Sequence, residues 1–208
     1  MNIKLVTYFD ANMAPIGKMT SGILYKYAAR HGYAAVCQTS AGATESGPAW
    51  NKIALVRQVL NCDGSDWVMW LDADAVIMNP EIKIENIIAG IPQDKDAAFA
   101  TDDNGLCSGV FLIKKSQWSL SFLDTVWFLK DINFEKDYGR GGRKWEQNCI
   151  KGLFKHFKSV ANRIHLLPQR AINSYEQNFE KDDFILHLAS CPNELRVAKL
   201  TQLLKTLE

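Results

Sequence analysis

The chain has 208 residues, of which 47% are hydrophobic, so it can bury a sizeable core and fits a single domain better than two small ones. Its 24 basic residues balance 23 acidic ones, for a formal net charge of +1. This balance gives no overall positive electrostatic field of the kind found in proteins that bind nucleic acids or membrane surfaces, so we expect neither partner. Any anion that the protein binds must be held by a local group of residues.

The five cysteines are an odd number without the C-x-x-C spacing of zinc sites. They indicate reduced thiols rather than a disulfide framework. The sequence shows neither the pattern of a signal peptide nor an apolar run long enough to span a bilayer. We therefore expect a soluble protein in a reducing compartment, with no membrane segment in this chain.

Hydrophobic periodicity predicts alternating strands and helices in the first part of the chain. In chain order these are a strand at 3–9, a helix that ends at Gly32, a strand at 33–37, a loop at 41–50, a helix at 50–60 and a buried strand at 67–71. This succession is typical of a parallel sheet with crossover helices.

The second part of the chain continues the alternation. We predict strands at 96–101 and 110–114, helices at 118–129 and 145–157, strands at 164–167 and 184–188, and a helix from residue 193. Some of these segments are joined too closely for a crossover helix, so the sheet should be mixed. The expected fold is α/β, with a Rossmann-like mixed sheet flanked by helices.

The stretch WVMWLDADAVIMNP, residues 67–80, places Asp72 and Asp74 directly after the buried strand. In open α/β sheets, ligands gather outside the carboxyl ends of the strands. Charges beside so apolar a run need a partner, and two carboxylates at this spacing can hold a divalent cation that in turn holds a diphosphate. A pattern this short also occurs by chance. In that case Asp72 would only cap the turn and Asp74 would be solvated.

Two classes of enzyme use such a pair. A haloacid-dehalogenase-like phosphatase has D-x-D-x-T/V after an apolar strand, which would make Asp72 the nucleophile with Mg²⁺ between the carboxylates. In such phosphatases the pattern normally lies near the N-terminus, whereas in this chain predicted strands and helices precede it. A nucleotide-sugar transferase of the GT-A type has D-x-D after a nucleotide-binding half, which is the order in this chain.

Further motifs are spread along the chain. They are YKYAARHGY (25–33), WNKIALVR (50–57), WVMWLDADAVIMNP (67–80), DDNGLCSGVFLIKKSQWSLSFLD (102–124), WEQN (145–148), PQRAINSY (168–175) and DDFILHLAS (182–190). In this order they resemble the motifs of glycosyltransferase family 34, the galactosyl-, mannosyl- and xylosyltransferases. The chain departs from them at Cys107, where the family has Asn, and at Asp182 and Ser190, where it has Gly. The segment SCPNE (190–194) lacks a basic residue that often faces the diphosphate.

The resemblance implies one GT-A domain over residues 1–208, with a nucleotide-binding half over about 1–100 and an acceptor half over about 101–208. It implies Mn²⁺ or Mg²⁺ held by Asp72, Asp74 and His187, and the imidazole favours Mn²⁺ because Mg²⁺ prefers oxygen ligands.

It also implies a set of residues around the nucleotide sugar. These are Thr7, Tyr8 and Asp10 at the end of the first strand, together with Lys52, Asp72, Ala73, Asp102 and Asn173. The first strand would cradle the base and ribose. Lys52 would reach toward the phosphates or the aspartate pair, Asp102 would bind the donor sugar, and Asn173 would serve the acceptor side.

The implied chemistry is retaining transfer through an oxocarbenium-like transition state, with Glu146, Gln147 and Asp103 as catalytic candidates. Glu146 would act as a transient nucleophile or an electrostatic stabiliser, although a glutamate at a helix N-terminus is also favoured by the helix dipole alone. The basic loop GRGGRK (139–144) could close over the diphosphate.

We therefore expect a metal-dependent, retaining glycosyltransferase that moves a sugar from UDP, or as second choice GDP, to a hydroxyl of a glycan or glycoprotein. The expected location is the cytoplasm, of a bacterium or of the host if the protein is viral, and a Golgi-lumenal domain cut from a longer chain is less favoured. The phosphatase and a non-catalytic sugar-nucleotide or glycan-binding module stay open as alternatives.

Overall fold

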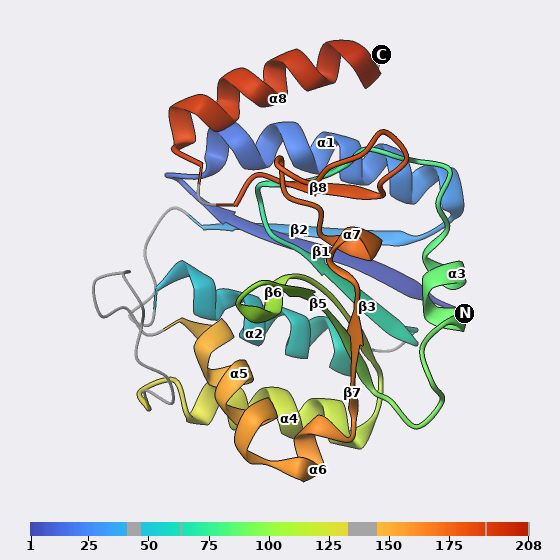
Figure 1. Cartoon of the computed structure of the whole chain (residues 1–208), viewed down its shortest axis with the longest axis vertical. Helices are drawn as coiled ribbons and strands as arrows, with labels where there is room; N and C mark the ends of the chain where they lie inside the picture. The colour runs from blue at the N-terminus through green and yellow to red at the C-terminus, as the bar shows by residue number, and fades with distance from the viewer. Residues whose placement is uncertain (41–46, 63, 133–144, 190, 208) are drawn as a thin grey trace.

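The computed structural model describes residues 1–40, 47–62, 64–132, 145–189 and 191–207. Its centre is a six-stranded sheet of order β2-β1-β3-β6-β5-β7 with helices on both faces (Figure 1). The strands are β1 (Ile3–Asp10), β2 (Ala34–Ser40), β3 (Trp67–Leu71), β5 (Ala97–Asp102), β6 (Gly105–Lys114) and β7 (Ile164–Leu167). β6 runs antiparallel to both of its neighbours, whereas the other pairs are parallel, so the prediction of a mixed α/β sheet is confirmed.

A smaller antiparallel sheet joins β4 (Ala75–Ile77) to β8 (Ile185–His187). β4 follows β3 almost directly and β8 comes near the end of the chain, so this pairing brings two distant segments together. The register places Ala75 opposite His187.

The helices form a layer on each side of the main sheet (Figure 1). One layer contains α1 (Ala14–His31) and α8 (Asn193–Leu207), and the other contains α2 (Pro48–Asn61), α4 (Gln117–Phe128), α5 (Glu146–His156) and α6 (Lys158–Ala161). The short helices α3 (Ile84–Ala89) and α7 (Gln169–Ile172) lie in connections. None of the helices in the described ranges is long and apolar enough to cross a membrane.

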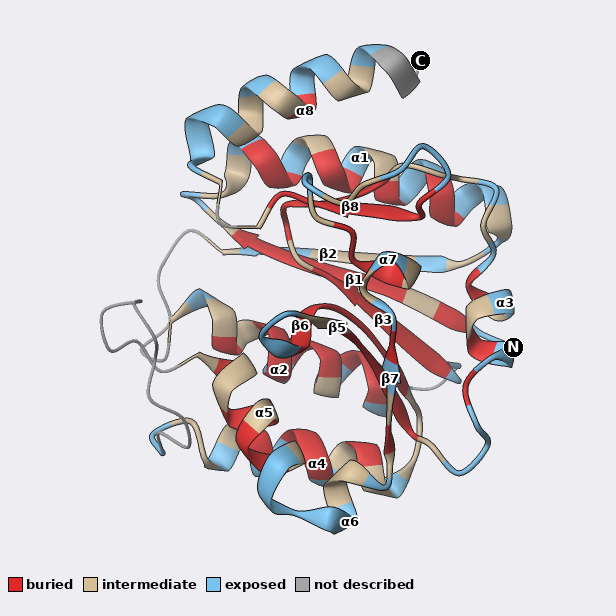
Figure 2. Cartoon of the chain, in the orientation of Figure 1, coloured by how far each residue is buried: buried red, intermediate tan, exposed pale blue. Residues whose placement is uncertain are grey.

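β3 is buried along its whole length because both of its faces are covered (Figure 2). Val68 and Trp70 belong to the core cluster that contains α2 and α4 residues, and Met69 and Leu71 belong to the cluster that contains α1 residues. This two-sided burial explains the unbroken apolar run, and it means that the first polar side chain after β3 stands at the edge of the sheet.

The structure differs from the sequence expectations at short elements. The predicted strand 110–114 is the second half of β6, which begins at Gly105 in a tight hairpin with β5. Gly105 has a φ of 94°, a conformation that favours glycine, and Asn104-Gly105 is a hairpin signal that the periodicity overlooked. β4, α3, α6 and α7 were not predicted, because segments this short carry too few residues to show a period.

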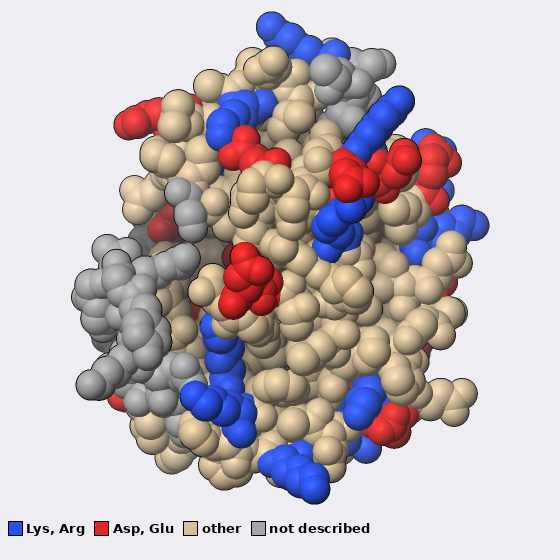
Figure 3. All heavy atoms as spheres, viewed as in Figure 1, with Lys and Arg blue, Asp and Glu red and all other residues tan. Residues whose placement is uncertain are grey.

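None of the five cysteines forms a disulfide, in agreement with the expectation that the sequence holds no disulfide framework. On the face seen in Figure 3, basic and acidic side chains are interspersed among uncharged ones, in agreement with the small net charge. Of the predicted loop at 41–50, residues 41–46 lie outside the described part of the chain.

Candidate metal and active site

The turn between β3 and β4 carries the two aspartates and is held from three sides. The backbone N–H of Asp72 donates to the carbonyl of Gly109 on β6 over 2.8 Å. The hydroxyl of Thr20 on α1 donates to the carbonyl of Ala73 over 2.8 Å. The N–H of Ala75 donates to the carbonyl of Asp72 over 2.9 Å. The turn is therefore fixed by the sheet, by a helix and by itself.

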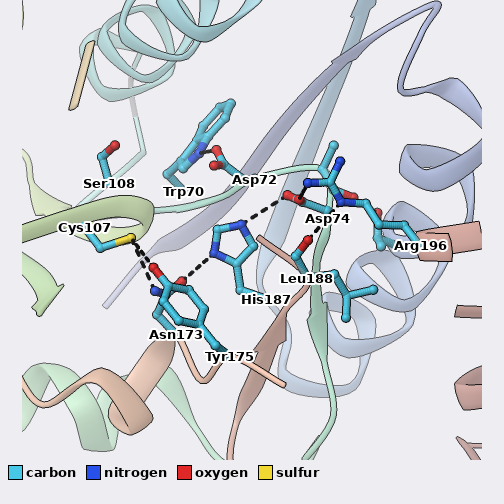
Figure 4. Close-up of polar contacts among 12 residues, drawn as sticks. Trp70, Asp72, Asp74, Cys107, Ser108, Asn173, Tyr175, His187, Leu188 and Arg196 are labelled. Atoms are coloured by element: carbon cyan, nitrogen blue, oxygen red, sulfur yellow. Dashed lines mark hydrogen bonds and ion pairs between the residues drawn. The ribbon is translucent and has the colours of Figure 1, made fainter. Parts of the chain in front are cut away.

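Three side chains that could ligate a metal meet at this turn. One ligand atom each of Asp72, Asp74 and His187 lies within 4.8 Å of the others, and Asp74 and His187 are buried (Figure 4). Oδ1 of Asp74 lies 3.2 Å from Nε2 of His187. The structure thus brings together the three residues that the sequence suggested as ligands, in a group that could hold a divalent metal.

Asn173 fixes the ring of His187. It is fully buried, and its side-chain oxygen lies 2.8 Å from Nδ1 of His187, so Nδ1 carries the hydrogen. Its amide nitrogen donates to Sγ of Cys107 over 3.3 Å. Both polar atoms of Asn173 are therefore engaged inside the protein, and Nε2 of His187 is the nitrogen left to face Asp74.

A buried lysine connects Asp72 to Glu146. The ammonium of Lys52, 4% exposed, donates to Oε1 of Glu146 at 2.7 Å and to the carbonyl of Ser108 at 3.0 Å, and lies 2.9 Å from Oδ1 of Asp72. Burial lowers the pKa of Lys52, but the charges of Asp72 and Glu146 outweigh this and raise it above its ordinary value. An ammonium has three hydrogens, and all three are used here.

Glu146 and Gln147 begin α5 and both contact Ser108. Oε1 of Glu146 accepts a hydrogen bond from the Ser108 hydroxyl at 2.9 Å, and the side-chain oxygen of Gln147 accepts one from the Ser108 N–H at 2.9 Å. Within the described parts of the chain, Oε2 of Glu146 is buried without a hydrogen-bond partner. A buried carboxylate oxygen without a partner is uncommon, and a catalytic role is one of its explanations.

Trp70 and Gly109 shape the other side of Asp72. The indole N–H of Trp70 donates to Oδ1 of Asp72 over 2.7 Å (Figure 4). Because Lys52 lies 2.9 Å from the same atom, this oxygen is held by Trp70 and Lys52. A Cβ added at Gly109 would lie 2.3 Å from Cε1 of His187, so only glycine fits beside the imidazole. The sequence placed Trp70 in the core, where it is, but gave no sign of its hydrogen bond.

The end of β1 lies at the same edge of the sheet as Asp72, because β1 and β3 are parallel neighbours. Thr7 and Tyr8 are buried, and the hydroxyl of Tyr8 contacts that of Ser40. Oδ1 of Asp10 accepts a hydrogen bond from the N–H of Met13 over 3.1 Å, at the start of α1.

Asp102 and Asp103 lie at the hairpin between β5 and β6. Oδ2 of Asp102 accepts a hydrogen bond from the hydroxyl of Tyr175 at 2.8 Å, and this hydroxyl lies 3.4 Å from Sγ of Cys107. Cys107 also contacts Asn173, so polar contacts connect Asp102 to the metal-site histidine. Asp103 is exposed on the turn.

Arg196 is a site residue that the sequence gave no reason to choose. It lies in the first turn of α8, and Nη2 is 3.0 Å from Oδ2 of Asp74 (Figure 4). Burial raises the pKa of Asp74, but the charges of His187 and Arg196 outweigh it and lower that pKa to about 2. The arginine therefore reaches the site from outside the segment 190–194, which has no basic residue.

The remaining predicted residues lie elsewhere. Arg140, Arg143 and Lys144 of the basic loop fall outside the described residues. His31 ends α1 and its ring contacts the carbonyl of Pro80 at 2.7 Å. His165 lies on β7.

Comparison with known sequences places these features in a family. A model of the galactosyl transferase GMA12/MNN10 family matches residues 23–94 and 89–198. The chain is 26% identical over 210 residues to the probable alpha-1,6-mannosyltransferase MNN10 of Saccharomyces cerevisiae, covering 79% of this chain and 53% of that protein. It is 25% identical over 193 residues to the probable alpha-1,2-galactosyltransferase gmh1 of Schizosaccharomyces pombe, covering 74% and 56%. The chain spans about half the length of these relatives.

Solved structures share the fold. One is a glycosyltransferase involved in glycosylation of the major capsid of PBCV-1, with a TM-score of 0.80 and 16% identity, covering 97% of this chain and all of that one. Another is the galactosyltransferase LgtC in complex with donor and acceptor sugar analogs, with a TM-score of 0.63 and 12% identity, covering 98% of this chain and 95% of that one. The chain has the GT-A fold and belongs to the galactosyl transferase GMA12/MNN10 family, glycosyltransferase family 34.

Proposed function

We propose that this protein transfers a sugar from a nucleoside-diphosphate donor, UDP first and GDP second, to a hydroxyl of a glycan or glycoprotein, with retention at the anomeric carbon. The observation that carries the proposal is the continuous contact from the Asp72, Asp74 and His187 cluster through Lys52 to Glu146. It puts a metal-binding set and a buried carboxylate side by side, as a reaction with an anionic leaving group and a cationic sugar requires.

The residues present fit a divalent metal. Asp72, Asp74 and His187 would hold it, and Asn173 supports this role because it leaves Nε2 of His187 as the ligating nitrogen. Mn²⁺ is our first choice and Mg²⁺ our second. When bound, the metal would neutralise the charge of the leaving diphosphate.

Glu146 is the residue that we propose for the sugar side of the reaction. Oε1 is held by Lys52 and Ser108, whereas Oε2 has no protein partner among the described residues. A carboxylate fixed by one oxygen can present the other to a developing positive charge, as an electrostatic stabiliser or a transient nucleophile. Gln147, Asp102 and Asp103 stay predicted contacts of the sugar.

The alternatives make different demands on the same residues. A phosphatase of the haloacid-dehalogenase type would use Asp72 as its nucleophile, but the match of the chain to GT-A structures favours the transferase over this alternative. A non-catalytic binding module would keep nucleotide binding without Glu146. Replacing Glu146 with alanine would then leave unchanged any slow hydrolysis of the donor, whereas we expect the hydrolysis to be lost.

The test is thermal unfolding with UDP, GDP, ADP and CMP, each with and without Mn²⁺, on the wild type and on Asp74→Asn. A ligand that binds only the native state raises the midpoint by an amount that grows with its concentration over its dissociation constant. We expect UDP or GDP to stabilise only with Mn²⁺, and Asp74→Asn to abolish the effect. Asp124→Asn is the control, because Asp124 pairs with Arg57 on the surface.

Stabilisation by Mg²⁺ with beryllium fluoride, and by no nucleotide, would overturn the transferase proposal in favour of the phosphatase. Equal stabilisation of the wild type and Asp74→Asn by UDP with Mn²⁺ would show that the metal is held elsewhere.

A further inference from the structure

Arg196 is held firmly against a metal-site carboxylate. Besides its 3.0 Å contact to Oδ2 of Asp74, Nε donates to the carbonyl of Leu188 at 2.9 Å and Nη1 donates to the side chain of Asn193 at 2.7 Å. The side chain is 14% exposed, compared with 38% for Lys199, one turn further along the same helix. Leu200 of this helix is fully buried in a cluster with α1 residues, so α8 is anchored independently of Arg196.

This contact opposes a metal that binds alone. Asp74 is one of the three ligands, and a dication on its carboxylate would lie close to the guanidinium. Two like charges at such a separation repel each other, and the repulsion is strong where water is partly excluded. Part of the charge of Asp74 is also already neutralised by Arg196, which weakens its attraction for a second cation.

Arg196 is also better placed than Lys52 to meet an anion. Lys52 has donated all three of its hydrogens to protein oxygens. A guanidinium has five hydrogens, of which the described contacts use only some, and its planar fork matches a phosphate with two parallel hydrogen bonds.

We infer that Arg196 neutralises Asp74 while the site holds no donor, and that it pairs with the diphosphate of the donor when metal and nucleotide bind together. This inference rests on the proposed function. It makes the binding of metal and nucleotide cooperative, because the diphosphate brings the negative charge that the guanidinium exchanges for Asp74. A metal without a nucleotide would then bind weakly.

The inference predicts opposite effects of one substitution. In Arg196→Gln the repulsion is gone, so Mn²⁺ alone should bind about three- to tenfold more tightly than to the wild type. The pairing with phosphate is gone as well, so UDP in saturating Mn²⁺ should bind about tenfold or more weakly. Arg196→Lys keeps the positive charge without the planar guanidinium. Its affinity for Mn²⁺ alone should resemble that of the wild type, and its affinity for UDP should lie between those of the wild type and Arg196→Gln.

The experiment is titration calorimetry on the full chain, with Mn²⁺ alone and then with UDP, or GDP if UDP does not bind, in saturating Mn²⁺. Lys199→Gln is the matched control, since it removes the same charge from the same helix at a residue that pairs with Glu176, and both of its affinities should equal those of the wild type. Weaker or unchanged Mn²⁺ binding by Arg196→Gln would overturn the claim that Arg196 weakens metal binding at Asp74. Unchanged nucleotide binding would overturn the claim that Arg196 pairs with the diphosphate.

These failures can be told apart from failure of the proposed function. If the wild type binds neither nucleotide with Mn²⁺, the transferase proposal fails and the diphosphate pairing falls with it. The titration with Mn²⁺ alone would still decide whether Arg196 opposes a metal at Asp74.

Discussion

The side-chain oxygen of Asn173 accepts the Nδ1 hydrogen of His187 over a distance of 2.8 Å. This bond settles which nitrogen is available as a ligand, because the other one, Nε2, lies 3.2 Å from the carboxylate of Asp74. A hydrogen bond of this kind orients the ring and raises the basicity of the ligand nitrogen. Asn173 therefore acts on the metal site through His187.

Replacing Asn173 with leucine should weaken Mn²⁺ binding about 10- to 100-fold, the usual cost of losing a residue that orients a metal-binding histidine. Asn173→Asp keeps an acceptor oxygen for Nδ1 and should retain most of the affinity. Calorimetric titration with Mn²⁺ measures both, and circular dichroism checks that both variants are folded. Wild-type affinity in Asn173→Leu would show that the ring is oriented by other contacts.

The pH dependence of metal binding should follow His187. Burial lowers the pKa of His187, but the charge of Asp74 outweighs it and raises this pKa above its ordinary value. A proton that is held more tightly competes better with a metal, so the Mn²⁺ affinity should fall as the pH is lowered from about 8 to about 6, by up to about tenfold per unit.

Titrations at several pH values measure this slope. His187→Asn should bind Mn²⁺ more weakly at every pH and should lose most of the dependence in this range, because no imidazole remains to be protonated. An equal slope in the variant would assign the proton to another group.

Long regular elements of the fold were predictable from the sequence, and elements that depend on distant partners were not. β3 was predicted with its observed ends because its apolar run is continuous from Trp67 to Leu71. β4 is only three residues long and follows the aspartate turn directly, so it shows no period of its own. Its identity as a strand comes from β8, with which it pairs.

The site shows the same division. Asp72 and Asp74 could be chosen from one short motif, but the selection of His187, Glu146 and Lys52 rested on resemblance to a family. Arg196 could not be found by either route, because it lies on an ordinary tail helix and is brought to Asp74 only by the packing of α8 on α1. Contacts of this kind depend on tertiary structure and leave no pattern in the sequence.

Replacing Lys52 with methionine should destabilise the fold by about 3–5 kcal/mol, because it leaves two carboxylates, one of them fully buried, without their cation. The double variant Lys52→Met with Glu146→Gln removes one of these charges and should recover part of the loss. Urea unfolding of the single and double variants gives the coupling energy.

Lys95→Met is the control for this cycle. Lys95 pairs with the exposed Asp94 and donates to the carbonyl of Asn162 at an exposed position, so its loss should change the free energy of unfolding by about 1 kcal/mol or less. Strictly additive effects of Lys52→Met and Glu146→Gln would contradict a direct pairing.

Asp183 should contribute stability that is lost in acid. Burial raises the pKa of its carboxyl, but hydrogen bonds from Arg170, the Glu180 N–H and Ser174 outweigh it and hold the pKa below its ordinary value. A lowered pKa in the folded state means that the contribution is complete above the unfolded pKa of about 4 and is lost as the pH falls through the folded pKa.

Asp183→Asn should therefore cost about 1–3 kcal/mol at pH 7, and the difference from the wild type should shrink below about pH 4. Denaturant unfolding at pH 7, 5 and 3 measures it. A difference that is constant over this range would mean that the charge of Asp183 is not what stabilises the segment before β8.

Gly109→Ala tests the metal site without changing any of its ligands. The added Cβ would lie 2.3 Å from Cε1 and 2.7 Å from Nδ1 of His187, distances that real Cβ atoms do not show, so the ring or β6 must move. Movement of the ring breaks its bond to Asn173, and movement of β6 shifts the carbonyl that holds Asp72. We expect a loss of about 1–3 kcal/mol in stability together with the loss of stabilisation by Mn²⁺ and nucleotide.

Gly22→Ala is the matched control, because it makes the same change on α1 where nothing lies within 4 Å. It should leave metal binding intact and stabilise the helix by about 0.5–1 kcal/mol. Thermal unfolding with and without Mn²⁺ compares the two variants. If Mn²⁺ raised the unfolding midpoint of Gly109→Ala as much as that of the wild type, metal binding would not depend on the position that His187 has here. The hydrogen bond between His187 and Asn173 would then not be needed for the site.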